Sequence, residues 1–297
     1  MKIKNRIEYR HIDDQKKWSI TTFTPLIDFK YDMELSSGEV VQAAALRLLT
    51  SGNVENHLCL STQAGCKFSC NFCTSGRAGF KRNMTKDEII NQIILIKDDL
   101  KIEKFDHVVF MGIGEPLDNL PALVSGIESI ISNDEYYKNR IDIATVGLPD
   151  KIIELSKYHL PISLWISLHA AIDGKRKILM PIAEKYSVRD VINAAAVYAN
   201  ETRSLVWLNY MLFSGFNDQN DDLQMLKNIL SGKKDVFGII VTQPNSKVMD
   251  KYYPATIEEI EIFYQKLSNM VDNRIVKFIT TGAEIKAGCG EFVFFGG

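Results

Sequence analysis

The sequence lacks the features that mark several common classes of protein. Its 297 residues contain no stretch approaching the roughly 18 uninterrupted apolar residues of a membrane-spanning helix, and its first residues are polar with charges of both signs. It also lacks an excess of positive charge. The formal net charge is −2, whereas proteins that bind many phosphates usually carry a basic stripe or domain. We therefore expect a cytoplasmic protein without membrane partners, and whole-chain charge gives nucleic-acid binding no support.

Cysteine is scarce, and its placement excludes a secreted disulfide framework. Only five cysteines occur: Cys59, Cys66, Cys70 and Cys73 lie close together, and Cys289 stands alone near the end. An odd, uneven set is not the pattern of a disulfide scaffold. Thiols packed this tightly in an intracellular protein bind metal or do redox chemistry more often than they serve as inert core residues.

Apolar, β-rich segments alternate with helical patterns along most of the chain. We expect strands at residues 33–49, 56–61, 107–111, 140–145, 162–168, 205–212, 237–241 and 275–280. Helix starts are predicted at Thr85 and Thr256, each followed three residues later by glutamate as in a capping box, and at Ser187. The alternation predicts an α/β fold with a parallel sheet, in the form of a partial barrel, because the strands from residue 56 onward number about seven, too few for a closed eight-stranded barrel. We expect a small β extension over residues 1–56 and the barrel over residues 57–297.

Three of the clustered cysteines have a spacing suited to an iron–sulfur cluster. Cys66, Cys70 and Cys73 follow a C-x3-C-x2-C pattern directly after a predicted strand. Three thiolates can hold three irons of a cubane and leave the fourth open for another ligand. A zinc site is the competing interpretation, but zinc motifs usually have a second ligand pair, and no further C-x-x-C and no H-x3-H occurs here.

The context of this loop resembles a known family. C-x3-C-x2-C with Phe72 before the last cysteine resembles the signature of the radical S-adenosylmethionine (SAM) superfamily. Four segments are similar in order and spacing to the RlmN and Cfr group of adenosine C-methylases, and together they span most of the chain: CLSTQAGCKFSCNFCTSGRAGFKRNMTKDEI, VVFMGIGEPLDN, SLHAAIDGKRKILMPI and EIKAGCGEF. The resemblance implies a (β/α)6-type radical SAM barrel, a [4Fe–4S] cluster on the three cysteines, two SAM molecules per turnover, and a low-potential electron donor such as flavodoxin or ferredoxin.

The resemblance also implies which residues hold SAM. The GEP element supplies Gly114 and Glu115 to the SAM ammonium group, and the strand end Ser167-Leu168-His169 matches further SAM-binding positions. Asn245 matches a SAM-binding asparagine when one alignment gap is allowed. Ala144 occupies a slot where the family usually has serine, so Thr145 is expected to supply the hydroxyl instead.

Two cysteines remain for the transfer chemistry implied by the resemblance. Cys289, flanked by glycines, matches the residue that carries the methyl group as S-methylcysteine. Cys59, seven residues before Cys66, matches the resolving thiol that attacks Cys289 and releases the product. The family also removes a substrate proton with a glutamate, and Gln42 stands in that slot here. An amide is no general base at neutral pH, so Glu39, Glu55, the substrate or water would have to take the proton.

The substrate is open between two enzymatic interpretations. In the first, the substrate is RNA, in which an adenosine is methylated at an sp² carbon, as in the members of the family. Binding would then use a local basic surface such as Lys67, Arg77, Lys81 and Arg82. The second is a free nucleotide or another small heteroaromatic compound. It is favoured by the acidic balance and by the few residues before Glu39 and after Cys289, which leave little room for the family's helical RNA-binding domain. A non-catalytic iron–sulfur or zinc module that binds RNA is a distant third, because it leaves Cys59, Cys289 and the GEP element unexplained.

Overall fold

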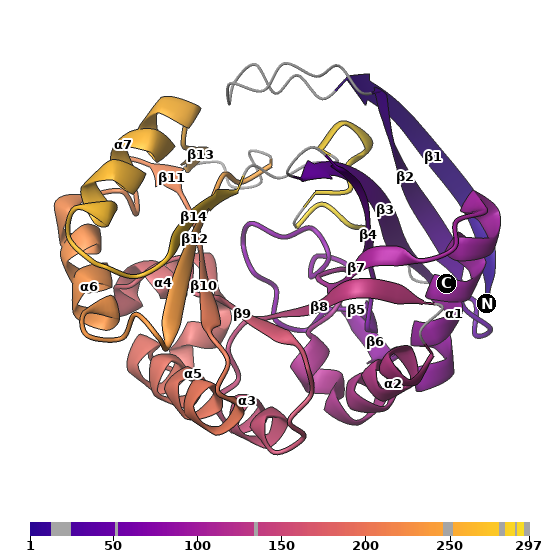
Figure 1. Ribbon diagram of the computed structural model, residues 1–297, viewed down its shortest axis with the longest axis horizontal. Coiled ribbons are helices and arrows are strands. Elements are labelled where there is room, and N and C mark those ends of the chain that lie inside the picture. The colour runs from indigo at the N-terminus through magenta and orange to yellow at the C-terminus, as the bar shows by residue number, and fades with distance from the viewer. Residues whose placement is uncertain are drawn as a thin grey trace.

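The alternating segments form one large sheet in the computed structural model, with helices along its outer side (Figure 1). The structure describes residues 1–12, 25–50, 53–133, 136–245, 252–278, 283–288 and 290–293. Within these residues, ten strands pair in the order β1-β2-β3-β4-β7-β8-β9-β10-β12-β14. Their bounds are β1 Lys2–Ile12, β2 Pro25–Glu34, β3 Val40–Thr50, β4 Asn53–Cys59, β7 Phe105–Phe110, β8 Tyr137–Thr145, β9 Ser163–Ser167, β10 Val206–Met211, β12 Phe237–Thr242 and β14 Ile275–Phe278.

Helices connect the parallel strands, as in repeated βα units. From β4 to β14 every neighbouring pair is parallel, whereas β1 to β4 are joined by antiparallel pairs. The helices are α1 Lys86–Leu100, α2 Leu120–Ser132, α3 Pro149–Ser156, α4 Asp173–Leu179, α5 Val188–Thr202, α6 Asn220–Leu230 and α7 Ile257–Ser268. Figure 1 shows the strands as an arc with the helices outside it. This confirms the predicted α/β class and partial barrel with a β extension.

Short elements complete the chain. Two small sheets pair β5 (Gln63–Gly65) with β6 (Phe80–Asn83) and β11 (Phe213–Ser214) with β13 (Tyr253–Pro254). The 3₁₀ helices are η2 Pro116–Asn119, η3 Pro181–Glu184 and η4 Ala283–Ile285. Among the described residues, no helix is both long and apolar enough to cross a membrane.

The predicted helix starts are confirmed by reciprocal hydrogen bonds. In α1 the Thr85 hydroxyl accepts from the backbone N–H of Glu88 at 3.2 Å, and the Glu88 carboxylate accepts from the N–H of Thr85 at 2.9 Å. The same capping box begins α7 at Thr256, and Ser187 caps α5 with Asp190 as its partner. Each cap satisfies backbone donors that the first helical turn leaves open.

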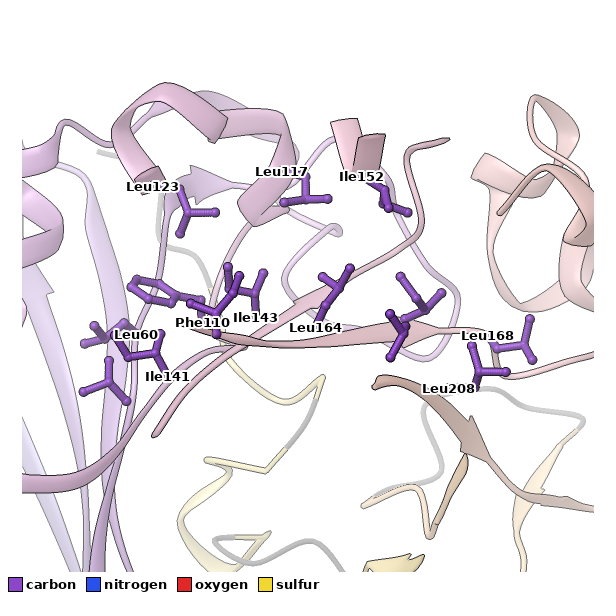
Figure 2. Packing of buried hydrophobic residues seen from close by; sticks show 14 of the residues in the cluster. Leu60, Phe110, Leu117, Leu123, Ile141, Ile143, Ile152, Leu164, Leu168 and Leu208 are labelled. Atoms are coloured by element: carbon purple, nitrogen blue, oxygen red, sulfur yellow. The ribbon is translucent and has the colours of Figure 1, made fainter. Parts of the chain in front are cut away.

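The main core lies between the sheet and the helices. Side chains that alternate along the parallel strands point to this outer face, among them Phe110, Ile141, Ile143 and Leu164, and pack against Leu117, Leu123 and Ile152 of the helical layer (Figure 2). The other face of the strands looks into the barrel. It carries polar and aromatic side chains instead, such as Trp165 and Asn209, so the interior of the arc is where chemistry is possible.

The N-terminal strands differ from the sequence prediction. One segment at residues 33–49 was expected, but it contains the end of β2, a turn and β3, and β1 was not predicted at all. Strand β1 sits at the edge of the sheet and is mostly charged or polar, which suits an edge exposed to water but hides the apolar pattern of a strand. The sheet runs without interruption across residue 56. The predicted division into a β extension over residues 1–56 and a barrel over residues 57–297 stays a prediction.

Candidate active site

The three-cysteine loop follows β4 and is held inside the arc by backbone hydrogen bonds. Cys66 donates its N–H to the carbonyl of Gly79 at 3.0 Å, and Cys73 donates to the carbonyl of Cys70 at 2.9 Å. Gly65 has φ +82°, and a Cβ there would lie 2.0 Å from the Gly79 carbonyl oxygen. Only glycine allows this close approach, so the residues that flank the three cysteines help to fix the conformation of the loop.

The thiols of Cys66, Cys70 and Cys73 line one cavity at the carboxyl ends of the parallel strands. Burial raises the pKa of Cys66 to about 12 and raises the pKa of Cys70 well above its ordinary value. Iron–sulfur ligation uses thiolates. Positive charge from iron would therefore have to hold these groups deprotonated, as it does in any buried thiolate cluster. The donor set fits a three-thiolate cubane.

Glu115 is a fully buried carboxylate in the same cavity. It accepts hydrogen bonds from the Thr145 hydroxyl at 2.5 Å, from the N–H of Val146 at 2.8 Å and from the N–H of Leu117 at 3.0 Å. Burial raises its pKa to about 7 despite these bonds. A cationic group such as an ammonium, placed in the cavity, would favour the charged form.

The Thr145 side chain is hydrogen-bonded to Glu115. Its hydroxyl donates to the Glu115 carboxylate and accepts from the N–H of Gly147 at 3.2 Å, while Ala144 lines the same cavity without a hydroxyl. Thr145 therefore lines the cavity and orients the carboxylate, and its expected contact with SAM stays a prediction.

Ser167 and His169 also line the cavity, whereas Leu168 packs into the core. His169 is buried with φ +53°, and its Nδ1 accepts from the N–H of Met211 at 3.1 Å. Desolvation lowers its pKa to about 3, so the imidazole is neutral and its hydrogen resides on Nε2. His169 can thus offer one N–H donor to a bound ligand.

Asn245 lies away from this cavity. Its side chain approaches Gly288, where an added Cβ would lie 1.6 Å from Nδ2. No described residue hydrogen-bonds that buried Nδ2 atom. Asn245 therefore contacts the segment next to Cys289, and its assignment to SAM stays a prediction.

Cys59 lines a second cavity on the inner face of the sheet. Cys289 lies outside the described residues, but its neighbours Gly288 and Gly290 both line this cavity. The Gly290 carbonyl accepts from the N–H of Thr74 at 2.8 Å, which ties the C-terminal segment to the cysteine loop. The two cavities adjoin, because they share the lining residues Cys73, Ser75, Met111, Gly112, Asn209 and Gly290.

The three acidic or amide positions considered for proton removal lie in different places. Gln42 is buried; its Nε2 donates to Asp32 at 2.7 Å and its Oε1 accepts from the N–H of Val293 at 2.7 Å. Glu39 is paired with Arg82 at 3.3 Å. Glu55 lies on β4, on the same alternating side of the strand as Cys59.

Two residues near the site were missed from the sequence. Arg176 on α4 is fully buried and donates to the carbonyls of Val146 at 2.6 Å, Leu168 at 3.2 Å and Ser167 at 3.3 Å. It ties together the ends of β8 and β9, which bear the cavity residues. His57, two residues before Cys59, lines the second cavity. His57 could have been predicted, because it lies two residues before Cys59 and therefore on the same side of the strand. No sequence pattern near Arg176 indicated its role.

Comparisons with known proteins agree with this site. A family model described as the radical SAM superfamily matches residues 60–227. The chain is 36% identical over 271 residues to "Probable dual-specificity RNA methyltransferase RlmN" of Dictyoglomus turgidum, covering 88% of this chain and 74% of the relative. It is 31% identical over 265 residues to the protein of the same description from Nostoc sp., covering 88% and 72%. Among solved structures, a radical SAM methyltransferase from Sphaerobacter thermophilus matches with a TM-score of 0.80 at 25% identity, over 89% of this chain and 77% of that one.

The partial barrel, the three-cysteine loop and the family model define a radical SAM enzyme of the methyltransferase class. Membership implies a [4Fe–4S] cluster and SAM as its cofactors, and the cavity residues fit both. Within the superfamily the chain belongs to the RlmN family, because its relatives of that description are matched over most of both sequences.

Proposed function

We propose that this protein methylates an sp² carbon of an adenine-type base in RNA, by way of an S-methylcysteine on Cys289. The main support is the junction of the two cavities. The wall they share contains Cys73 of the cysteine loop and Gly290, the neighbour of Cys289. A carrier at that junction could exchange groups with a cofactor on one side and a base on the other. RNA is preferred because the relatives are described as RNA methyltransferases.

In this proposal the cluster cavity binds and orients SAM. Cys66, Cys70 and Cys73 hold the cluster, the Glu115 carboxylate and Gly114 receive the ammonium group, and Ser167 and His169 complete the binding site. Leu168 supports this wall from the core, and Asn245 packs against Gly288 outside the cavity. Thr145 keeps Glu115 aligned through its 2.5 Å hydrogen bond. When bound, the cofactors supply a 5′-deoxyadenosyl radical that removes a hydrogen atom from the S-methyl group, with the electron coming from a flavodoxin- or ferredoxin-type donor.

The cysteines perform the transfer. The Cys289 thiolate attacks the methyl carbon of a first SAM, so a thioether S–C bond forms and S-adenosylhomocysteine leaves. The carbon radical formed on Cys289 bonds to the substrate carbon, and the adduct then loses one electron, which the oxidised cluster would accept, and the proton of that carbon. The Cys59 thiolate attacks the Cys289 sulfur, forming a disulfide as the S–C bond breaks. The electron pair of that bond stays on the departing carbon, which takes up a proton and leaves as the methyl group of the base. Cys59 lies on the wall of the cavity that Gly288 and Gly290 also line, which supports this role.

The test is to trap the covalent adduct. Without Cys59 the adduct cannot be resolved, so the Cys59→Ala variant, reconstituted anaerobically and given SAM and reductant, should retain nucleotide on the Cys289 peptide. Nuclease digestion followed by mass spectrometry identifies what is attached. RNA oligonucleotides support the proposal, and a lone nucleotide or another small heteroaromatic compound would support that substrate class instead.

Two controls accompany the trap. The Cys66→Ala variant should lose the broad iron–sulfur absorbance and form no adduct. The parent protein incubated with SAM alone should carry a methyl group on Cys289. An unmodified Cys289 together with a substrate adduct on another residue would refute the carrier role.

A further inference from the structure

A histidine lies on the wall of the Cys59 cavity where no family motif calls for one. Residues Glu55, His57 and Cys59 alternate along β4, so their side chains share one side of the strand. His57 and Cys59 both line the cavity, together with Gly288 and Gly290. His57 therefore lines the same cavity as Gly288 and Gly290, the two neighbours of Cys289 in the chain.

The surroundings of His57 fix how its ring can act. Its Nε2 lies 3.1 Å from Oε2 of Glu55, and its ring stacks on that of His107 with centroids 4.2 Å apart. A carboxylate at Nε2 assigns the ring hydrogen to that nitrogen and leaves the Nδ1 lone pair as the acceptor. No described residue hydrogen-bonds to Nδ1. Glu55 thus orients the ring in the way a carboxylate orients a catalytic histidine.

The charge balance around His57 keeps the ring neutral. Desolvation lowers its pKa below the ordinary value of 6.5; Arg140 lowers it further, while Glu55 and Asp106 act in the opposite direction. His107 packs against it and has a lowered pKa of its own. Across this cavity Asp142 is paired with Arg140 at 2.8 Å. A neutral imidazole at pH 7 is ready to accept a proton.

The other candidates for this role are engaged elsewhere. Gln42, in the slot of the family's glutamate, has its amide bonded to Asp32 and to the backbone of Val293. Glu39 is bound by Arg82. Glu55 does not line the cavity itself but reaches it through His57.

We propose that His57 is the general base that removes the proton from the substrate carbon receiving the methylene group. This inference rests on the proposed function. Once the adduct has lost its unpaired electron, as described for the proposed function, the C–H bond breaks, its electron pair restores the aromatic ring, and the proton bonds to Nδ1 of His57. The resulting imidazolium is stabilised by its Nε2–H donating to the Glu55 carboxylate. Cys59 then resolves the adduct as described.

The test compares His57→Gln with His107→Gln. The two histidines are register partners on adjacent strands, stack on each other and both approach Oε2 of Glu55, at 3.1 Å from His57 and 3.5 Å from His107. Only His57 lines the cavity, so His107→Gln controls for the loss of a histidine next to Glu55 that cannot meet the substrate. Each variant is reconstituted with its cluster and supplied with ¹³C-methyl SAM, reductant, and either unmodified RNA transcripts or AMP as probes. Methylated base and methyl on Cys289 are quantified separately by mass spectrometry.

The expected result separates base catalysis from the earlier steps. His57→Gln should keep Cys289 methylation and SAM cleavage but lose product formation by about 100-fold or more, the usual contribution of a general base. His107→Gln should form product at close to the parental rate. Imidazole added to His57→Gly should restore part of the lost rate. The parental rate should fall as acidic pH protonates His57, and that dependence should be absent from His57→Gln.

Several outcomes would overturn the assignment. Product at the parental rate from His57→Gln would show that the base lies elsewhere while leaving the proposed function intact. Loss of Cys289 methylation in the same variant would place His57 in an earlier step. A stoichiometric divalent metal in the parent protein that is absent from both histidine variants would make Glu55, His57 and His107 a metal site. Absence of product and of Cys289 methylation in the parent protein would refute the proposed function itself.

Discussion

Replacing Gly114 by alanine tests how the GEP segment builds the cofactor cavity. Gly114 has φ +103°, and a Cβ there would lie 2.5 Å from Cβ and 2.8 Å from Cγ of Gln63. Those atoms are close to the Gln63 backbone and cannot swing away. The Gln63 side chain in turn accepts from the N–H of Glu115 at 2.8 Å and donates to Asp118 at 2.9 Å. The substitution should therefore disturb the position of Glu115.

Two costs add in the Gly114→Ala variant. Holding a non-glycine residue at this φ costs about 1–3 kcal/mol. Forcing a methyl group into a filled site costs about 1–3 kcal/mol more. We expect a loss of about 2–6 kcal/mol in the free energy of unfolding, measured by urea denaturation of the anaerobic apoprotein with tryptophan fluorescence.

Matched glycines separate the two contributions. Gly79 has φ +77° but nothing within 4 Å of an added Cβ, so Gly79→Ala should show the backbone strain alone. Gly174 has neither a positive φ nor a neighbour within 4 Å, and Gly174→Ala should be neutral or stabilise by up to about 1 kcal/mol. Equal losses in Gly114→Ala and Gly79→Ala would refute the steric argument and the contact with Gln63 on which it depends.

Three further predictions concern buried groups of the same cavity. Thr145→Val removes the hydroxyl bonded to Glu115 and should cost about 1–3 kcal/mol in stability and weaken SAM binding in equilibrium dialysis; unchanged binding would contradict its orienting role. Arg176→Met leaves three carbonyls without their donor and should cost about 1–3 kcal/mol for each carbonyl left unsatisfied, measured by urea denaturation, and a fully stable variant would argue against the link between β8 and β9. Because burial raises the pKa of Glu115 from 4.5 to about 7, its contribution to stability is full below pH 4.5 and declines by about 3 kcal/mol as pH rises through 7. Urea midpoints at pH 5 and pH 8 should show this decline in the parent apoprotein but not in Glu115→Gln, and equal pH dependence would exclude Glu115 as its source.

The sequence predicts what local signals encode. The parallel strands lie where apolar, β-rich runs indicated them, and the capping boxes at Thr85 and Thr256 begin helices as expected. The cysteine loop could be proposed as a cluster-binding loop from sequence alone, because the spacing of the three cysteines is what lets them bind one iron–sulfur cluster. The edge strand β1 was missed because its charged residues face water and give no apolar pattern.

The rest of the site depends on contacts between residues far apart in the chain. Thr145 meets Glu115 across 30 positions, and Arg176 reaches the carbonyl of Val146 across another 30. Neither pairing has a local pattern, because each follows from which strands become neighbours in the sheet. His57 belongs to the same group, since its importance depends on the cavity that the assembled sheet encloses.

Gln42 shows why a departure from a family motif must be judged with its partners. Its Nε2 donates to Oδ1 of Asp32 at 2.7 Å, and its Oε1 accepts from the N–H of Val293. A glutamate in this slot would turn an acceptor toward the Asp32 carboxylate, exchanging a hydrogen bond for repulsion between like charges. The amide is therefore matched to Asp32 and fastens the C-terminal segment to β3. Restoring glutamate at position 42 alone would recover the family's residue but not a base in the family's environment, and a base elsewhere on the cavity wall, such as His57, resolves that difference.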